Sequence, residues 1–281
     1  MYEIGQPMGA GTPIRRTPKY TKPQSVQRPI HRLSIIIPCY NEASTISIIL
    51  DKINDVELYC SVKKEIIVIN DCSTDDTDLM ISEFIEEHPE AGIIYKVHAQ
   101  NGGKGCAIQT GLAAATGEYV LIQDADLEYD PKEYNLLLEP VLSGHADVVY
   151  GSRFMGGQPH RILFFWHTIG NKVLTFISNL FTNMNLTDAH TCYKVVPLNI
   201  LKNIPLLEKR FAFDAELNVK LSYIPGVRIY EVGISYYGRT FSEGKKIRMG
   251  DAFRTIYCLI KYTFFSSTVS LKTIQLSVPS N

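Results

Sequence analysis

Short apolar runs alternate with amphipathic stretches along the chain from residue 33 onward. Apolar runs of four to eight residues are typical of buried strands, and apolar positions three or four residues apart are typical of helices. This alternation predicts β-α-β units around a mostly parallel sheet, an α/β fold. The predicted strands cover residues 33–38, 65–71, 92–98, 118–124, 146–150 and 228–236. The predicted helices cover residues 42–54, 75–87, 103–115, 131–143, 162–181, 213–222 and 248–265.

Two of these helices are notably apolar. The helix at 248–265 carries an apolar stripe at helical spacing, which we expect to pack against the sheet. The stripe consists of Met249, Phe253, Ile256, Ile260 and Phe264. The helix at 162–181 is interrupted by polar residues and falls short of the roughly 20 apolar residues that a membrane span needs. We therefore expect no membrane-spanning helix.

The first 32 residues differ from the rest of the chain. They contain five prolines and six Lys or Arg residues, with Glu3 as the one acid. Such a segment cannot form a core, so we expect 1–32 to be a flexible basic tail, 33–265 to be the folded domain and 266–281 to be a C-terminal tail. The tail is either a solvated leader or a segment attracted to an anionic membrane surface, at about 1 kcal/mol per basic residue.

Composition narrows the class of protein. The chain has 281 residues, of which 45% are hydrophobic and 20% charged, and these are ordinary values for a soluble globular protein. Its net charge of -1 argues against a nucleic-acid binder. The six cysteines show no paired spacing and the N-terminus shows no signal pattern, so we expect a reducing, cytoplasmic location without zinc or disulfides.

Polar residues directly follow five of the predicted strands. In parallel sheets ligands bind beyond the carboxyl ends of the strands, so these residues are expected to share one rim. The segments are 38–42 (Pro-Cys-Tyr-Asn-Glu), 70–73 (Asn-Asp-Cys-Ser), 101–105 (Asn-Gly-Gly-Lys-Gly), 124–126 (Asp-Ala-Asp) and 151–153 (Gly-Ser-Arg). Their convergence predicts an enzyme.

Two carboxylates at one strand tip are the candidate metal ligands. Asp124 and Asp126 are two residues apart, so they point the same way, and Glu128 continues the alternation. Oxygen ligands of this kind suit Mg²⁺ or Mn²⁺ bridging to a diphosphate. The alternative is a solvated turn with helix-capping aspartates.

The glycine-rich segment 101–105 precedes a predicted helix. Free backbone N–H groups and the helix dipole would favour an anion there, although an exposed turn is the competing interpretation. It is not a P-loop, because Gly105 stands where Ser or Thr should follow Lys104. Asp71 is a candidate for contacting a nucleotide base or ribose. Phosphate-pairing candidates in the second half are Arg153, Arg161, Arg239, Lys245 and Lys246.

Taken together, these motifs resemble those of family 2 glycosyltransferases with the GT-A fold, in particular dolichyl-phosphate and polyprenyl-phosphate mannose or glucose synthases. The resemblance extends over about 33–262 and includes three further segments. These are 187–194 (Thr-Asp-Ala-His-Thr-Cys-Tyr-Lys), 213–216 (Phe-Asp-Ala-Glu) and 237–239 (Tyr-Gly-Arg) leading to 244–246 (Gly-Lys-Lys). It implies a nucleotide-sugar half at 33–150 and an acceptor half at 151–265.

The resemblance also implies roles for individual residues. Those implied to bind the nucleotide sugar are Pro38, Tyr40, Glu42, Asp71, Lys104, Asp124, Ala125, Asp126, Arg239 and Lys245. Those implied to hold the metal are Asp124, Asp126 and Glu128, and those implied to face the acceptor are Arg153, Arg161 and Asp188. Asp126, Arg153 and Asp214 are the implied catalytic residues.

The expected activity is inverting transfer of a hexose from a nucleotide diphosphate sugar to a polyprenyl or dolichyl phosphate at the cytoplasmic membrane face. A phosphate acceptor is already ionised and needs no general base. A saccharide or protein hydroxyl acceptor would need one, and Asp188 or Asp214 would be the candidates. A non-catalytic nucleotide-sugar binding subunit and a nucleotidyltransferase are further alternatives, although the latter lacks its glycine-rich loop after the first strand.

Overall fold

The computed structural model describes residues 30–162, 165–239 and 249–265. Its seven strands form one sheet in the order β3-β2-β1-β4-β6-β5-β7. The strands are β1 (Arg32–Cys39), β2 (Lys63–Asn70), β3 (Ile94–Val97), β4 (Tyr119–Ile122), β5 (Val148–Ser152), β6 (Lys194–Pro197) and β7 (Ile229–Gly233). All pairings are parallel except those of β6, which runs antiparallel to β4 and β5. The predicted mostly parallel sheet is confirmed.

Strand β6 was not predicted, and it joins the two predicted halves of the domain. It has four residues and ends at Pro197, so its apolar run is too short to stand out. Because β6 pairs with β4 on one side and β5 on the other, residues 33–150 and 151–265 contribute to a single sheet. Most of tail 1–32 lies outside the described residues, as does 266–281, and Arg32 already belongs to β1.

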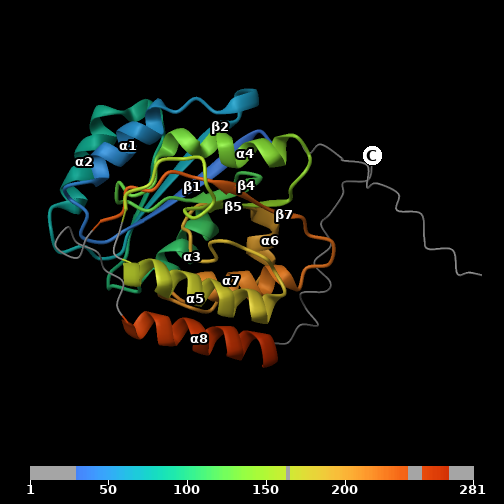
Figure 1. Cartoon of the computed structure of the whole chain (residues 1–281). Coiled ribbons are helices and arrows are strands. Elements are labelled where there is room, and N and C mark those ends of the chain that lie inside the picture. The colour runs from blue at the N-terminus through green and yellow to red at the C-terminus, as the bar shows by residue number, and fades with distance from the viewer. Residues whose placement is uncertain (1–29, 163–164, 240–248, 266–281) are drawn as a thin grey trace, which may run out of the picture.

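Helices cover both faces of the sheet (Figure 1). They are α1 (Ile46–Asp55), α2 (Thr77–Glu87), α3 (Lys104–Ala114), α4 (Tyr134–Leu142), α5 (Phe165–Thr182), α6 (Leu198–Asn203), α7 (Phe213–Ser222) and α8 (Met249–Phe264), with short 3₁₀ turns at Tyr59–Ser61, Pro89–Ala91 and Pro131–Glu133. Helices α1, α2 and α4 lie on one face and α3, α6 and α7 on the other, with α5 and α8 outermost (Figure 1). The central strand β1 is covered on both faces, which explains why Ile35, Ile36 and Ile37 are all buried.

Helix α8 packs on α7 and α5 rather than on the sheet. Its buried side chains include Cys258, Leu259 and Tyr262, which form a small core with α7. The predicted packing of the 248–265 stripe against the sheet is therefore wrong: Phe253 is 70% exposed and Phe264 is 67% exposed. The helix has two apolar faces, and periodicity alone does not say which is buried. None of the described helices is long and apolar enough to cross a bilayer.

A buried carboxylate, Glu208, anchors α8 to the rest of the domain. It accepts hydrogen bonds from Arg254 at 2.9 Å, from the Tyr262 hydroxyl at 2.8 Å and from Lys261 at 3.3 Å. Burial raises the pKa of Glu208, but the hydrogen bonds outweigh burial and lower it to about 2. Charge-assisted bonds of this kind stabilise by about 1.5–3 kcal/mol each.

We expect Glu208→Gln to lower the melting temperature at pH 7 by about 5 °C. Because the folded-state pKa lies below the ordinary value, the carboxylate stabilises the fold above about pH 4.5, and this contribution disappears as the pH falls toward 2. The melting temperatures of parent and variant should therefore converge in acid. Thermal unfolding followed by circular dichroism between pH 7 and pH 3 measures the difference, and a constant difference across that range would contradict the assignment.

Candidate active site

The carboxyl ends of β1, β2, β4 and β5 meet at one rim, as predicted, and buried polar contacts hold its turns in place. Gln123, directly after β4, donates its backbone N–H to Ile36 at 2.9 Å. Its side-chain oxygen accepts from the hydroxyls of Tyr134 and Tyr193 at 2.8 and 2.7 Å. These bonds fix the backbone immediately before Asp124, so the two aspartates leave the sheet in a defined direction.

The predicted carboxylates and cations of the donor side contact one another. Lys104 Nζ lies 2.6 Å from Asp124 Oδ1. Arg239 lies 2.8 Å from Asp126 Oδ2 and 3.1 Å from Glu42 Oε2. Residues that are up to 197 positions apart in sequence therefore form one charged cluster.

Glu128 is used differently from the two aspartates. Its Oε1 accepts the backbone N–H of Arg239 at 2.7 Å, and its Oε2 accepts the hydroxyl of Tyr236 at 2.8 Å. Both oxygens thus bind the segment that carries Arg239. These contacts place Glu128 as a support for that segment, and its predicted role as a metal ligand remains a prediction.

The electrostatics of the cluster suit a divalent cation. Burial raises the pKa of Asp126, the nearby Asp124 and Glu128 add to this effect and Arg239 opposes it, and the resulting pKa is about 7. Burial also raises the pKa of Asp124, but Lys104 outweighs it and holds the pKa below the ordinary value. When ionised, the carboxylates of residues 42, 124, 126 and 128 exceed the two cations by two negative charges. A metal with oxygen preference fits that excess and that donor type, although within the described ranges no three acidic, His or Cys side chains already converge as a ligand shell.

The glycine-rich segment binds an anion that belongs to the protein itself. Asp71 accepts the backbone N–H groups of Gly102 and Gly103 at 2.9 and 2.7 Å. It also contacts His98 Nδ1 at 2.7 Å, and His98 Nε2 lies 2.8 Å from the Thr110 hydroxyl. A Cβ at Gly105 would lie 2.2 Å from the Glu208 carbonyl oxygen, so this glycine allows close packing. The expectation that these N–H groups are free for a phosphate is wrong for the two that bind Asp71.

Of the predicted acceptor residues, Arg153 directly follows β5 and Asp188 lies in the loop between α5 and β6. Arg153 forms a two-pronged ion pair with Asp188, with distances of 2.6 Å from Nε and 2.8 Å from Nη2. Asp188 is completely buried, and Arg153 outweighs the effect of burial to keep the pKa of Asp188 low. Arg161 is exposed and donates from Nη1 to the Gly238 carbonyl at 3.0 Å.

Tyr236 connects the acceptor side to the donor side, which the sequence did not reveal. Its hydroxyl binds Glu128, its ring lies 5.1 Å from the Arg153 guanidinium carbon, and its carbonyl accepts the Arg161 backbone N–H at 2.8 Å. The strand predicted over 228–236 includes Tyr236, whereas β7 ends at Gly233. The position of Tyr236 three residues before Arg239 was the available signal.

The remaining predicted residues are more dispersed. Asp214 forms an ion pair with the fully buried Lys194 at 2.6 Å. Tyr40 is 36% exposed at the end of β1, where Pro38 is half-buried, and Ala125 is buried between the two aspartates. Lys245 and Lys246 lie outside the described residues.

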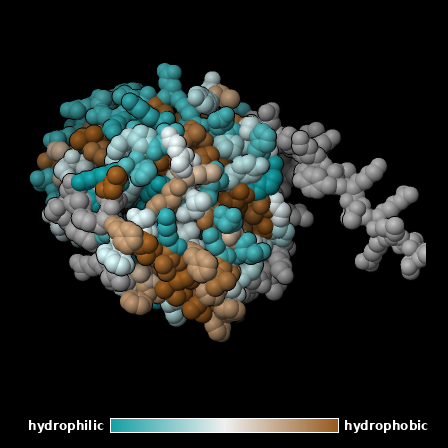
Figure 2. All heavy atoms as spheres, in the orientation of Figure 1, coloured by the Kyte–Doolittle hydropathy of each residue, from teal (hydrophilic) through white to brown (hydrophobic). Residues whose placement is uncertain are grey.

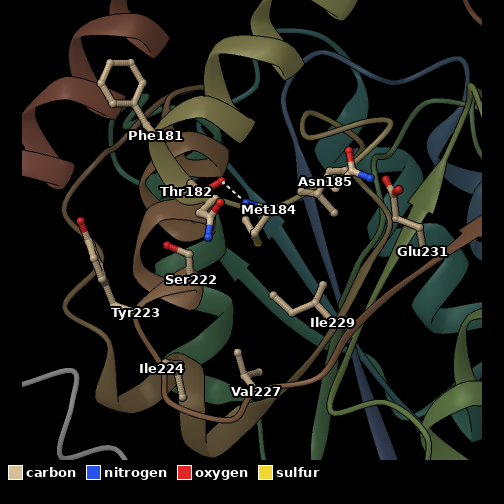
Figure 3. Close-up of a pocket in the computed structure, with 12 residues that line it drawn as sticks. Phe181, Thr182, Met184, Asn185, Ser222, Tyr223, Ile224, Val227, Ile229 and Glu231 are labelled. Carbon is tan, nitrogen blue, oxygen red and sulfur yellow. Dashed lines mark hydrogen bonds between the residues drawn. The ribbon is translucent and has the colours of Figure 1, made fainter.

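A cavity of about 670 Å³ lies apart from the charged cluster (Figure 3). Its lining runs from the end of α5 through Met184 and Asn185 to Tyr223 and Ile229, and includes no residue predicted for the site. Glu231 lines it and accepts the backbone N–H groups of Thr187 and Asp188 at 2.8 and 3.1 Å. The cavity thus adjoins the loop that holds Asp188, and none of its lining residues belongs to the charged cluster.

The chain is similar in sequence or fold to several known proteins. A dolichyl-phosphate beta-glucosyltransferase of Dictyostelium discoideum is 27% identical over 235 residues, covering 76% of this chain and 68% of that protein. A dodecaprenyl-phosphate galacturonate synthase of Rhizobium johnstonii is 22% identical over 233 residues, covering 83% and 67%. The crystal structure of glucosyl-3-phosphoglycerate synthase from Mycobacterium tuberculosis, in complex with Mn²⁺, UDP and phosphoglyceric acid, has the same fold at a TM-score of 0.62, with 18% identity over 83% of this chain and 78% of that one.

The family model for glycosyl transferase family 2 matches residues 34–204. This stretch is more than half of the chain and runs from β1 through β6, including both aspartates of the rim and the Arg153–Asp188 pair. The match confirms the resemblance seen in the motifs, and the shared fold confirms the GT-A architecture. The chain belongs to glycosyl transferase family 2 and is a glycosyltransferase.

Proposed function

We propose that this enzyme transfers a hexose, with inversion, from a nucleotide diphosphate sugar to the phosphate of a polyprenyl or dolichyl phosphate at the cytoplasmic face of a membrane, where it is peripheral. Two of its relatives are named for polyprenyl-type phosphates as acceptors. The charged cluster and the two acceptor arginines are consistent with a reaction between two phosphate-bearing substrates.

On the donor side, Asp124 and Asp126 would hold Mg²⁺ or Mn²⁺, in line with the Mn²⁺ and UDP in the structure of similar fold. The metal supplies Lewis-acid stabilisation of the leaving diphosphate. Lys104 and Arg239, which now neutralise the aspartates, would be released toward the diphosphate oxygens. Pro38, Tyr40, Glu42 and Asp71 would flank the nucleoside at the ends of β1 and β2.

We favour a phosphate acceptor over a hydroxyl acceptor because both candidate general bases are held in ion pairs. Asp188 is sealed under Arg153, and its low pKa makes it a poor proton acceptor. Asp214 binds the buried Lys194. An acceptor hydroxyl would have to lose its proton to one of them, whereas a phosphate monoester arrives ionised. Arg153 and Arg161, on either side of Tyr236, are the cations that would receive it.

Arginine variants test the acceptor assignment. We expect Arg161→Ala and Arg153→Ala to raise the Michaelis constant for polyprenyl phosphate, or lower turnover, by about tenfold or more, because each removes a charge-assisted contact to phosphate. Hydrolysis of the nucleotide sugar without acceptor should change little.

Arg228→Ala is the matched control, because Arg228 forms a similar two-pronged pair with Asp147 at the opposite ends of β5 and β7. It should leave both rates near those of the parent. If the Arg153 and Arg161 variants transfer to polyprenyl phosphate as well as the parent does, the arginines are structural and a hydroxyl acceptor becomes the better assignment.

A further inference from the structure

Helices α5 and α8 share an apolar surface that no part of the described chain covers. Figure 2 shows brown and tan side chains gathered over these two outermost helices. We call this surface the α5–α8 face and define it by Trp166, Val173, Phe176 and Leu180 on α5 with Phe253 and Phe264 on α8, all of them at least half exposed. The α5 members are seven, three and four residues apart and the two α8 members are eleven apart, about three turns, so the members on each helix lie on one side of it.

The two helices contact each other, and both pack on α7 beneath them. The rings of Phe181 and Phe264 meet edge to face at 6.0 Å, and Cys258 and Leu259 of α8 pack on Ala215 and Val219 of α7. The inward side of each helix is thus already occupied, and the exposed side chains are a second apolar surface. An 18-residue helix such as α5 is about 27 Å long, so the face is large for a surface without a partner.

Charges border this face and are mostly positive. Residues 160–182 contain Arg161 and Lys172 with no acid, and residues 249–265 contain Arg254 and Lys261 with Asp251 as the one acid. Because Glu208 pairs with Arg254 and Lys261, the four cations exceed Asp251 and Glu208 by two positive charges. Aromatic side chains on one side of a helix and Lys or Arg along its edge are the pattern of helices that lie flat in a membrane interface. Trp is enriched at membrane–water interfaces, and Trp166 is 76% exposed.

We propose that the α5–α8 face docks on an anionic lipid bilayer, with both helices parallel to the membrane surface and their aromatic side chains inserted among the acyl chains. This differs from attraction through the basic tail, because the binding energy comes mainly from apolar insertion and the cations orient the protein. A second copy of the chain is a poorer occupant. In a two-fold interface each patch meets its own image, which would bring the cationic edges together.

The proposed orientation on the membrane suits a lipid phosphate as the acceptor. Arg161 directly precedes Ile162, which is 92% exposed, three residues before α5 begins. Arg161, a candidate for binding phosphate, and the apolar Ile162 are therefore adjacent and lie just before α5. A lipid phosphate could reach Arg161 while its chain stays in the bilayer. This last step rests on the proposed function, whereas the docking itself does not.

The single tryptophan allows a direct test on the unmodified full-length chain. Trp166 is the one Trp among the 281 residues and is 76% exposed. Its emission should shift to shorter wavelength when vesicles of phosphatidylcholine and phosphatidylglycerol are added, and lipids brominated along the acyl chain should quench it. Vesicles that bind the protein without shifting Trp166 would overturn the proposal, since attachment would then occur elsewhere. A shift that grows with protein concentration in the absence of lipid would assign the face to a second copy, which also overturns it.

A matched pair of variants tests the same point by flotation with those vesicles, without substrates. Leu180→Glu on α5 should reduce the bound fraction by about tenfold or more, as should Phe253→Glu on α8. Leu79→Glu changes a leucine that is 52% exposed on α2, across the sheet from α5, and should bind as the parent does. Equal binding by all three variants would overturn the proposal. Transfer to a short, water-soluble prenyl phosphate, assayed separately, reports on the proposed function, so the two can fail independently.

Discussion

Asp126→Ala is expected to lower sugar transfer by about a thousandfold while the protein stays folded. Asp126 sits at the rim, where its carboxylate contacts Arg239 at 2.8 Å and the Glu128 backbone N–H at 3.2 Å. The substitution removes one of the two carboxylates that we propose as metal ligands. Without the metal, the negative charge on the departing diphosphate would not be compensated. Initial rates with saturating Mn²⁺ or Mg²⁺, together with a circular dichroism spectrum of the variant, measure the effect.

Asp130→Ala serves as the control for this variant. Asp130 lies four residues further along and caps a 3₁₀ turn by accepting the Lys132 backbone N–H, without contact to the charged cluster. We expect it to retain parental activity. Undiminished transfer by Asp126→Ala in the presence of EDTA would show that no metal is held at this carboxylate.

Arg239→Ala should reduce kcat/KM for the nucleotide sugar by about a hundredfold. The guanidinium contacts both Glu42 and Asp126, so it lies between the nucleoside side of the rim and the proposed metal. If a metal binds Asp126, the Arg239 guanidinium would be free of that contact and could pair with the diphosphate.

Arg239→Lys tests whether the guanidinium group's geometry is needed or whether a positive charge is enough. A lysine keeps the charge but cannot reproduce contacts to Glu42 and Asp126 in one plane, so it should recover only a small part of the loss. Donor saturation curves for the parent and both variants give the comparison. Activity of Arg239→Ala within threefold of the parent would remove Arg239 from the donor site.

The parts of the fold that could be predicted are those with uninterrupted apolar runs in the sequence. Strands β1 and β2 each have eight residues and contain the apolar runs 35–37 and 66–69, and the structure places both strands within a few residues of the predicted bounds. Strand β6 has only four residues and pairs antiparallel between β4 and β5. A short run in a loop-like segment carries no information about the strand beside which it will lie.

In the candidate site, too, the residues could be predicted but their partners could not. Glu42, Lys104, Asp126 and Arg239 were predicted from motifs, and the structure brings them together in one cluster. Their pairing with one another was not predictable, because it depends on contacts between distant segments. Likewise, Asp71 and the glycine-rich segment 101–105 were each predicted to bind a ligand. In the structure they bind each other, because Asp71 accepts the backbone N–H groups of Gly102 and Gly103.

The apolar helices show why the predicted packing of α8 failed. A stripe at helical spacing indicates a surface that avoids water, and in a globular chain the core is the usual partner. Here α8 buries its other side, with Cys258 and Leu259, against α7. Nothing in the periodicity distinguishes a stripe that faces a core from one such as Phe253 and Phe264, which face outward.

The central claim is that the phosphate of a polyprenyl phosphate receives the sugar, and one measurement with the parent protein addresses it directly. The enzyme would be incubated with Mn²⁺, a panel of nucleotide diphosphate sugars and three acceptors in parallel: a short polyprenyl phosphate, phosphoglyceric acid and a free saccharide. Mass spectrometry of the products and release of nucleoside diphosphate would be followed together. We predict a glycosyl phosphate lipid, formed in equal amount to the nucleoside diphosphate, only with the polyprenyl phosphate. Sugar transfer to phosphoglyceric acid or to the saccharide, with none to the lipid phosphate, would contradict the claim.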